Sequence, residues 1–247
     1  MSPELAPEEI AAALDAVATD VLGSAGIHAP PVDCLHLARA LGITVAVDDS
    51  QPGRARYVRL CGRRSGPARP AILLSGEPRG ERRHWAIAHE IGEHAAHRVF
   101  DRLGIEPCET ARNARETVAS QLAGRLLLPT RWFVPDAEEC RWDLLAMKLR
   151  YATASHELIA RRMLECPPPV IISIFDHGEL WFRRGNLAGR AAPLSTVELE
   201  CWRAVHTLGL ARQEWEATRT IQGWPVHEEG WKREILRTEA AEFGADF

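Results

Sequence analysis

Long apolar runs are absent from the sequence. No stretch of its 247 residues approaches the roughly 18 consecutive apolar residues that a membrane-spanning helix needs. The first residues carry acids, including Glu4, Glu8 and Glu9, where a secretory signal carries bases. We therefore expect a cytoplasmic protein that neither crosses nor contacts a membrane.

Strong charge of one sign and clustered cysteines are also missing. A formal net charge of -4 creates no field that would gather nucleic acid, so direct nucleic-acid binding is not expected. The 6 cysteines are scattered without a C-x-x-C pair, which argues against a zinc ribbon and against a compact disulfide framework. What remains is the composition of an ordinary soluble protein, long enough for one large domain or two modest ones.

Apolar spacing and turn residues predict the order of helices and strands. Helices are expected at about residues 7–26, 34–41, 78–103 and 109–127, with two short ones within 143–164. Strands at 43–47, 55–60 and 70–75 are expected to form a small antiparallel sheet.

The segment after the three prolines at 167–169 starts a different pattern. Segments 170–175 and 179–184 flank Asp176-His177-Gly178 and predict a β-hairpin. A capping-box pattern at 194–198 opens a further helix, and the rest of the chain to residue 247 is expected to be helical. We expect three parts, residues 1–140, 141–166 and 167–247, and the role of the last is unknown.

The long helix expected at 78–103 carries the hexamer HEIGEH at residues 89–94. A metallopeptidase needs two ligands four residues apart on one helical face and a carboxylate beside the first, so that base, metal and water come together. The hexamer departs from the usual H-E-x-x-H because its fifth residue is Glu93. In a forward register His89 and Glu93 are ligands and Glu90 is the base. In a reverse register Glu90 and His94 are ligands and Glu93 is the base.

Helical periodicity favours the forward register. Positions 89 and 93 share a face with apolar residues such as Phe100, whereas 90 and 94 lie nearer polar residues such as Asp101. A metal must be held against the body of the protein, so we expect His89 and Glu93 to lie on the buried side. His94 and His97 then become outer or surface groups, and His84 is expected at the surface near the helix start. The alternative is a solvated helix face whose Glu and His residues only pair with one another.

The first four residues of the hexamer end the segment RRHWAIAHEIG at 82–92. This segment is preceded by PPVD at 30–33 and followed by ETVASQLAGRLLLP at 116–129. These segments resemble the ImmA/IrrE family of metallopeptidases, over about residues 8–165. The resemblance implies an α+β fold, with a zincin-like unit that has a small antiparallel sheet and a long active-site helix, followed by a helix-turn-helix-like segment. The C-terminal hairpin and helices expected from the sequence pattern complete this fold. The resemblance also implies a protein substrate, because characterised members cleave helix-turn-helix repressors in phage-like element control or stress responses.

The same resemblance places Glu116 as the third metal ligand, on the helix after the motif. An apolar stripe that includes Val118 and Leu122 starts beside it, which favours a ligand over a surface acid. Glu109 is the reserve candidate.

From these residues we expect a metal-dependent endopeptidase. His89, Glu93 and Glu116 would hold a divalent metal, zinc first and manganese second, and Glu90 would take a proton from the water that the metal activates. Glu93 in place of a histidine adds a negative charge to the ligands and weakens the metal as a Lewis acid, which predicts slow proteolysis or a relaxed metal preference. The alternative is an inactive pseudo-peptidase that binds its partner as a regulatory module.

Overall fold

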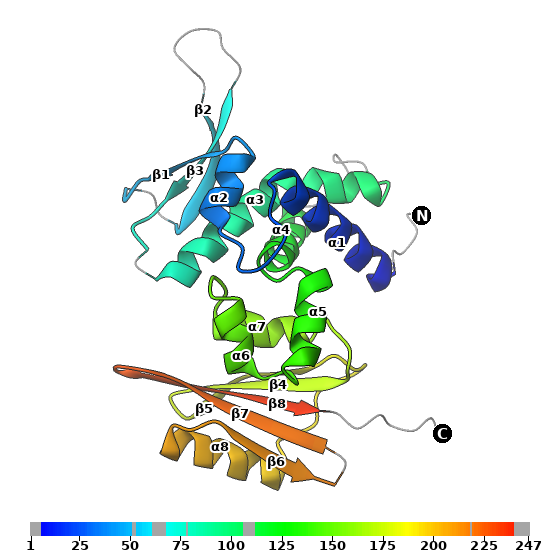
Figure 1. Cartoon of the computed structure of the whole chain (residues 1–247), viewed down its shortest axis with the longest axis vertical. Helices are drawn as coiled ribbons and strands as arrows, with labels where there is room; N and C mark the ends of the chain where they lie inside the picture. The colour runs from blue at the N-terminus through cyan, green and yellow to red at the C-terminus, as the bar shows by residue number, and fades with distance from the viewer. Residues whose placement is uncertain are drawn as a thin grey trace. The chain divides into compact units, whose positions relative to one another are not determined.

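The computed structural model of the chain describes residues 6–50, 53–60, 68–77, 79–105, 112–217 and 219–239. The chain divides into two compact units, each with its own sheet (Figure 1). Unit 1 comprises residues 1–135 and 150–155, and unit 2 comprises residues 136–149 and 156–247. Among the described residues, none of the helices has the length and apolarity that crossing a membrane requires. The α+β class expected from the sequence is confirmed.

Unit 1 contains the helices and strands that the sequence predicts for the first half of the chain. Its helices are α1 (Pro7–Ser24), α2 (Cys34–Ala40), α3 (Gly80–Arg102) and α4 (Arg112–Leu127), and α5 (Thr130–Glu139) begins in it. Local signals set several of these bounds. Asp33 caps α2 by accepting hydrogen bonds from the backbone N–H groups of Leu35 and His36, and Gly42 adopts a positive φ of 71° beyond its end. Helix α5 was not expected, because it starts directly after Pro129 and contains Pro135.

The sheet of unit 1 is mixed, and the expectation of a wholly antiparallel sheet is wrong. Its strands are β1 (Thr44–Val47), β2 (Ala55–Leu60) and β3 (Arg69–Leu74), in the order β1-β3-β2. Strand β2 pairs with β3 in the antiparallel sense, whereas β1 pairs with β3 in the parallel sense. The reason is that β3 lies between the other two and runs in the direction of β1.

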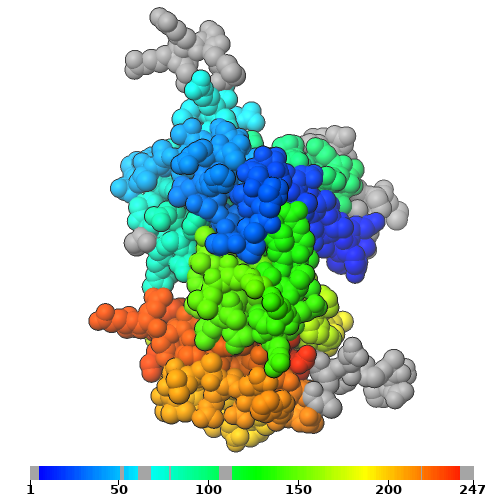
Figure 2. Space-filling view, in the orientation of Figure 1, coloured from blue at the N-terminus to red at the C-terminus, as the bar shows by residue number. Residues whose placement is uncertain are grey.

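Helix α3 is the centre of unit 1. It packs against α1, α2, α4, β2 and β3, so it is covered on several sides. Figure 2 shows α1 and α2 in blue at the surface of this unit. The buried residues of α3 therefore do not form a single stripe: they are Ala86, Ile87, Ala88, Glu90, Ile91, Gly92, Ala95, Ala96, Val99 and Phe100. Such a helix gives a periodicity analysis no single buried face to detect.

Unit 2 is built on a five-stranded sheet of antiparallel pairs, in the order β5-β4-β8-β7-β6. The strands are β4 (Val170–Asp176), β5 (Glu179–Gly185), β6 (Arg212–Glu216), β7 (Arg219–Glu228) and β8 (Trp231–Glu239). Its helices are α7 (His156–Met163), α8 (Thr196–Leu208) and α6 (Leu144–Arg150), of which only the last residue belongs to unit 1. Helix α7 packs against β4 and β8, and α8 packs against β6, β7 and β8.

The β4–β5 hairpin and the start of α8 are confirmed. The Ser195 side chain accepts a hydrogen bond from the backbone N–H of Glu198 at 3.2 Å, and the Glu198 carboxylate accepts one from the backbone N–H of Ser195 at 2.8 Å. The expectation of helices beyond α8 is wrong, because the described residues after it form β6, β7 and β8. Strand β8 is central and is buried along 234–238, so it lacks the alternation of a half-buried strand, and its Glu234 and Arg237 resemble surface residues.

Candidate metal centre

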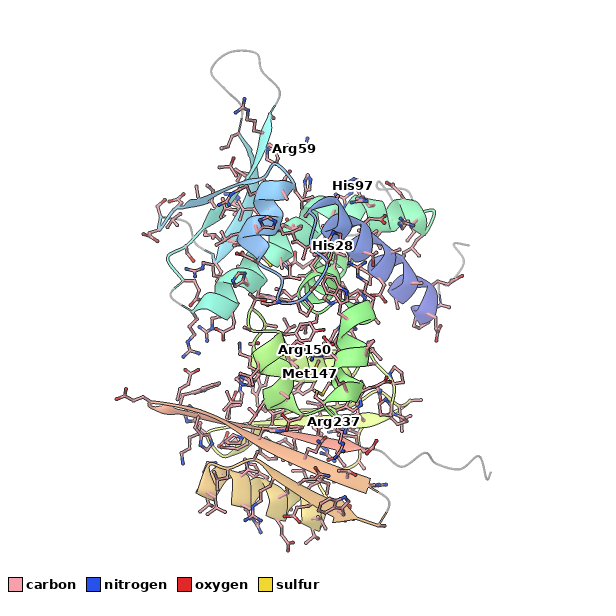
Figure 3. The ribbon with its side chains drawn as sticks, viewed as in Figure 1. His28, Arg59, His97, Met147, Arg150 and Arg237 are labelled. Carbon is pink, nitrogen blue, oxygen red and sulfur yellow. The ribbon has the colours of Figure 1, made fainter. Side chains whose placement is uncertain are left out.

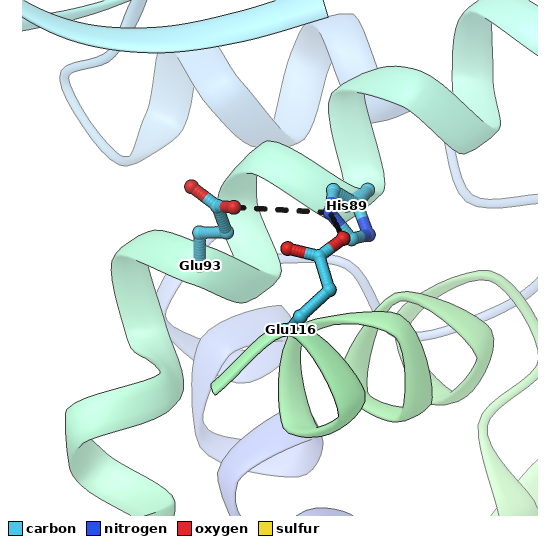
Figure 4. A group of neighbouring side chains, drawn as sticks. All are labelled: His89, Glu93 and Glu116. Carbon is cyan, nitrogen blue, oxygen red and sulfur yellow. Dashed lines mark ion pairs between the residues drawn. The ribbon is translucent and has the colours of Figure 1, made fainter. Parts of the chain in front are cut away.

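Three side chains that the sequence singles out as metal ligands lie together in unit 1 (Figure 4). His89 and Glu93 lie one turn apart on α3, and Glu116 lies in the second turn of α4. The His89 Nε2 atom lies 3.0 Å from Glu116 Oε1 and 3.9 Å from Glu93 Oε1. One ligand atom from each residue lies within 4.8 Å of the other two. The side chains of Glu93 and Glu116 are 43% and 60% exposed, so water and a substrate can reach the cluster.

The close crossing of α3 and α4 brings Glu116 to His89. Gly92 lies against the backbone of α4, where an added Cβ would lie only 2.4 Å from the carbonyl oxygen of Ala119. Any side chain at position 92 would therefore push the two helices apart. The glycine of the HEIG segment thus has a structural role beside the ligand positions.

Ser120 contacts the ring of His89 on the side away from Glu116. Its Oγ atom lies 3.4 Å from His89 Nδ1, at the long end of hydrogen-bond distance. A hydrogen bond from Nδ1–H to this hydroxyl would leave Nε2 unprotonated, which is the form of histidine that binds a metal. Sequence reasoning did not assign Ser120 a role, although its position four residues after Glu116 on one helix face was a usable signal.

Glu90, expected to be the catalytic base, is the buried acid of the motif. It is 7% exposed, and its Oε2 atom accepts a hydrogen bond of 2.6 Å from the backbone N–H of Tyr57 on β2. Burial raises the pKa of the Glu90 carboxyl above its ordinary value, and the nearby Glu93 carboxylate adds to this shift, while the Tyr57 hydrogen bond opposes it.

The expectation that His89 and Glu93 lie on the buried side is wrong. Glu90 is more buried than Glu93, because β2 covers the side of α3 that carries Glu90. The ligand cluster faces the crossing with α4, where it stays open. The choice of His89 and Glu93 as the ligand pair therefore cannot rest on burial. It rests on the contact of His89 with Glu116.

The remaining histidines of α3 have other neighbours. The Nδ1 atom of His94 lies 2.9 Å from the hydroxyl of Tyr57, and that of His97 lies 3.0 Å from the carbonyl oxygen of His94. Burial lowers the pKa of His94 below its ordinary value, with His97 and Arg59 adding to the shift. His84 is partly buried rather than a surface residue, because its Nδ1 atom accepts a hydrogen bond from the backbone N–H of Cys34 at 3.2 Å.

These contacts give the reverse register no third ligand. Among the described residues, the only group of His, Cys, Asp or Glu side chains with metal-binding spacing is His89, Glu93 and Glu116. Glu109, the reserve candidate, lies outside the described residues.

Comparisons with known proteins identify the family and the fold of the chain. The family described as the IrrE N-terminal-like domain, Peptidase_M78, matches residues 38–163, slightly more than half of the chain. A solved structure of a Mycobacterium tuberculosis transcriptional regulator is similar to the chain, with a TM-score of 0.62 and 19% sequence identity, over 91% of this chain and 75% of that chain. Similarity at this level of identity shows a shared fold. No curated protein sequence matches the chain significantly.

Proposed function

Because the chain belongs to the Peptidase_M78 family, that of the IrrE N-terminal-like domain, we propose that it is a metal-dependent endopeptidase that hydrolyses a peptide bond in a protein partner. The family membership confirms the resemblance seen in the sequence. The observation that carries the proposal is the convergence of His89, Glu93 and Glu116, with the carboxylate of Glu90 next to the first ligand on the same helix.

The donor atoms of the cluster suit a divalent metal. An imidazole nitrogen and two carboxylate oxygens are ligands that zinc accepts, and three protein ligands leave a position for water, as in catalytic zinc sites. The two carboxylates together balance the charge of a divalent ion, so a harder ion such as manganese becomes more competitive than at a site with two histidines. Zinc is therefore the first ion to test and manganese the second.

Each residue has a defined role in this proposal. A divalent ion at the cluster would lower the pKa of a water molecule and polarise the scissile carbonyl. Glu90 would take the proton from that water and pass it to the leaving amine. The hydrogen bond from Tyr57 N–H fixes one oxygen of Glu90, which holds the carboxylate in one orientation for both transfers. Ser120 would keep Nε2 of His89 available for the ion.

The partner in this proposal is a protein, and a helix-turn-helix repressor is the first candidate. Family membership favours this substrate, and the similar fold of a transcriptional regulator is compatible with a setting in gene control. The arginines of α7 support a protein over a nucleic acid. Arg161 is paired with Glu157 at 2.9 Å and Arg162 with Glu165 at 2.8 Å, so their charges are already balanced within the chain.

Metal content of the purified protein tests the proposal. Elemental mass spectrometry should find close to one zinc or manganese ion per wild-type chain after gentle purification or reconstitution. Glu93→Ala and Glu116→Ala should each lose most of this metal. His94→Ala is the matched control, because His94 follows Glu93 in the chain but contacts Tyr57, and it should keep its metal. Loss of metal from His94→Ala with retention by Glu93→Ala would support the reverse register instead.

A second candidate function is a partner-binding module without catalysis. The observation that favours it is Glu93 itself, since the added negative charge weakens the metal as a Lewis acid. A wild-type protein that binds neither zinc nor manganese after reconstitution, yet still retains a protein partner, would overturn the peptidase proposal in favour of this one.

A further inference from the structure

Arg237 is a buried cation in the middle of the unit 2 sheet. It lies on β8, opposite Ile172 of β4 and Gln222 of β7, and only 2% of it is exposed. Figure 3 labels Arg237 in this sheet. A buried arginine ordinarily has an acidic partner, because an uncompensated charge is costly to remove from water.

The hydrogen bonds of Arg237 are incomplete. Its Nη1 atom donates to the side-chain oxygen of Gln222 at 3.1 Å, whereas its Nε and Nη2 atoms are buried and have no hydrogen-bond partner among the described residues. Within the same part of the chain, no carboxylate forms an ion pair with it. Nε and Nη2 form one edge of the guanidinium group, with two parallel N–H donors, and this edge binds the two oxygens of a carboxylate or phosphate.

The guanidinium group has an aromatic neighbour and, among the described residues, no acid in ion-pair contact. The Arg237 Cζ atom lies 5.3 Å from the centre of the Trp142 ring, and Ile172 beside it is fully buried. Burial lowers the pKa of Arg237, and Glu239 only partly opposes this shift from two residues further along the strand. A bound anion would satisfy both donors and supply the missing negative charge.

A turn at residues 140–143 covers Arg237. Arg141 and Trp142 adopt positive φ values of 54° and 59°, a backbone conformation that residues with side chains rarely take. Two side chains of β7 hold the turn: Gln222 donates to the Arg141 carbonyl at 3.2 Å, and the Trp224 ring N–H donates to the Asp143 carboxylate at 3.1 Å. The turn also joins α5 to α6, with Trp142 N–H donating to the Ala137 carbonyl at 2.6 Å. It must shift to admit a ligand, because the two unpartnered nitrogens of Arg237 are buried.

We propose that Arg237 anchors a binding site for a small molecule with a carboxylate or phosphate group, which takes two hydrogen bonds from Nε and Nη2 beneath the 140–143 turn. Trp142 and Ile172 would contact the body of the ligand. All these residues belong to unit 2, so the site is separate in sequence and chemistry from the His89 cluster, and it does not depend on peptidase activity.

The test is thermal unfolding of the full-length protein with sodium acetate or sodium phosphate, each compared with sodium chloride at equal ionic strength. Under the proposal, one of the two anions raises the wild-type melting temperature in a saturable way, and the anion that does so identifies the group bound. Arg237→Met removes the donors, so its apparent affinity for that anion should fall at least about tenfold. Arg237→Lys keeps the charge without the parallel donors, so it should stay folded and respond weakly even if Arg237→Met fails to fold.

Two further variants serve as controls. Arg184→Met changes an exposed arginine of β5, opposite Ile172 on the same face of the sheet, and should respond to anions as the wild type does. Glu239→Gln removes the acid that partly compensates the charge of Arg237. The anion should therefore raise the melting temperature of this variant more than that of the wild type. The proposal is overturned if the wild type responds to acetate and phosphate no more than to chloride. It is also overturned if the response is the same in Arg237→Lys and Arg184→Met, or if Glu239→Gln abolishes it.

Discussion

Gly92 of α3 lies against the carbonyl oxygen of Ala119 of α4, at the point where the two helices cross. A Cβ atom at position 92 would lie 2.4 Å from that oxygen, and no flexible side chain is there to give way. Glu116 lies three residues before Ala119, and Ser120 directly follows it, so both contacts of α4 with His89 depend on this crossing. The glycine sets the distance between the two halves of the ligand cluster.

We predict that Gly92→Ala separates α3 from α4 and weakens metal binding. Overpacking at a buried contact of this kind should lower the free energy of unfolding by roughly 1–3 kcal/mol. The displacement moves Glu116 away from His89, so the metal content should fall as well. Urea denaturation measures the first effect, and elemental mass spectrometry measures the second.

Gly124→Ala is the matched control, because Gly124 is also a helical glycine, but beyond its own stretch of helix no described atom lies within 4 Å of an added Cβ there. Alanine at this position should leave metal binding unchanged and should raise the free energy of unfolding by up to about 1 kcal/mol. Equal loss of metal in both variants would show that the crossing at Ala119 is not what positions Glu116.

We predict that Ser120→Ala weakens metal binding without unfolding the protein. The hydroxyl orients the His89 ring from its Nδ1 side, and losing such an outer contact reduces metal affinity by about 10- to 100-fold. Because the distance between Ser120 Oγ and His89 Nδ1 is long, we expect a loss of affinity near the lower end of this range. Competition with a chromogenic chelator gives the affinity. Thr117→Ala is the control, since Thr117 is exposed on the same helix and bonds only to the Asn113 carbonyl among the described residues, and it should bind metal as the wild type does.

Local signals were enough to predict the helices around the metal centre. The hexamer gave the spacing of His89 and Glu93, and the family resemblance gave Glu116, while the capping pattern at Ser195 gave the start of α8. Each of these signals is read within a few residues of the chain. The structure brings the three proposed ligands together, and their role in binding a metal stays a prediction.

Non-local pairing explains what the sequence could not reveal. His206 and His227 lie 3.0 Å and 2.6 Å from the same Oε1 atom of Glu234, a buried acid of β8 that also accepts a hydrogen bond from Trp202. Nothing within the local sequence of β8 indicates that donors on α8 and β7 surround this acid. For this reason the sequence pattern predicts a helix where the structure has β8. Burial of Glu90 went unseen for the same reason, since its cover comes from β2.

We predict that Glu198→Gln strongly destabilises the protein. Glu198 is 2% exposed, and its carboxylate pairs with both terminal nitrogens of Arg183, at 2.9 Å and 3.0 Å. The variant leaves the Arg183 guanidinium without its carboxylate, and breaking a buried pair in this way costs about 3–5 kcal/mol. Glu200→Gln, an exposed position on the same helix, should change the free energy of unfolding by less than about 0.5 kcal/mol. Similar free energies of unfolding for the two variants in urea denaturation would contradict the assignment of Glu198 as the buried partner of Arg183.

Glu90→Gln is predicted to separate metal binding from catalysis. Glutamine keeps the oxygen that accepts the hydrogen bond from Tyr57 N–H, so the fold and the metal content should match the wild type. It cannot take a proton, so peptide hydrolysis should fall by at least about 100-fold. An inactive variant that still binds should also retain its substrate, which affinity purification and mass spectrometry would identify.

The retained protein then decides between the two candidate functions. Incubated with metal-loaded wild type, it should be cut at a defined bond, and with metal-loaded Glu90→Gln it should stay intact. Asp101→Asn, an exposed acid near the end of α3, should cut as the wild type does. A retained partner that stays intact with both loaded proteins would mean that Glu93 has left the site able to hold a metal and a protein but unable to hydrolyse it, which is the behaviour of a binding module.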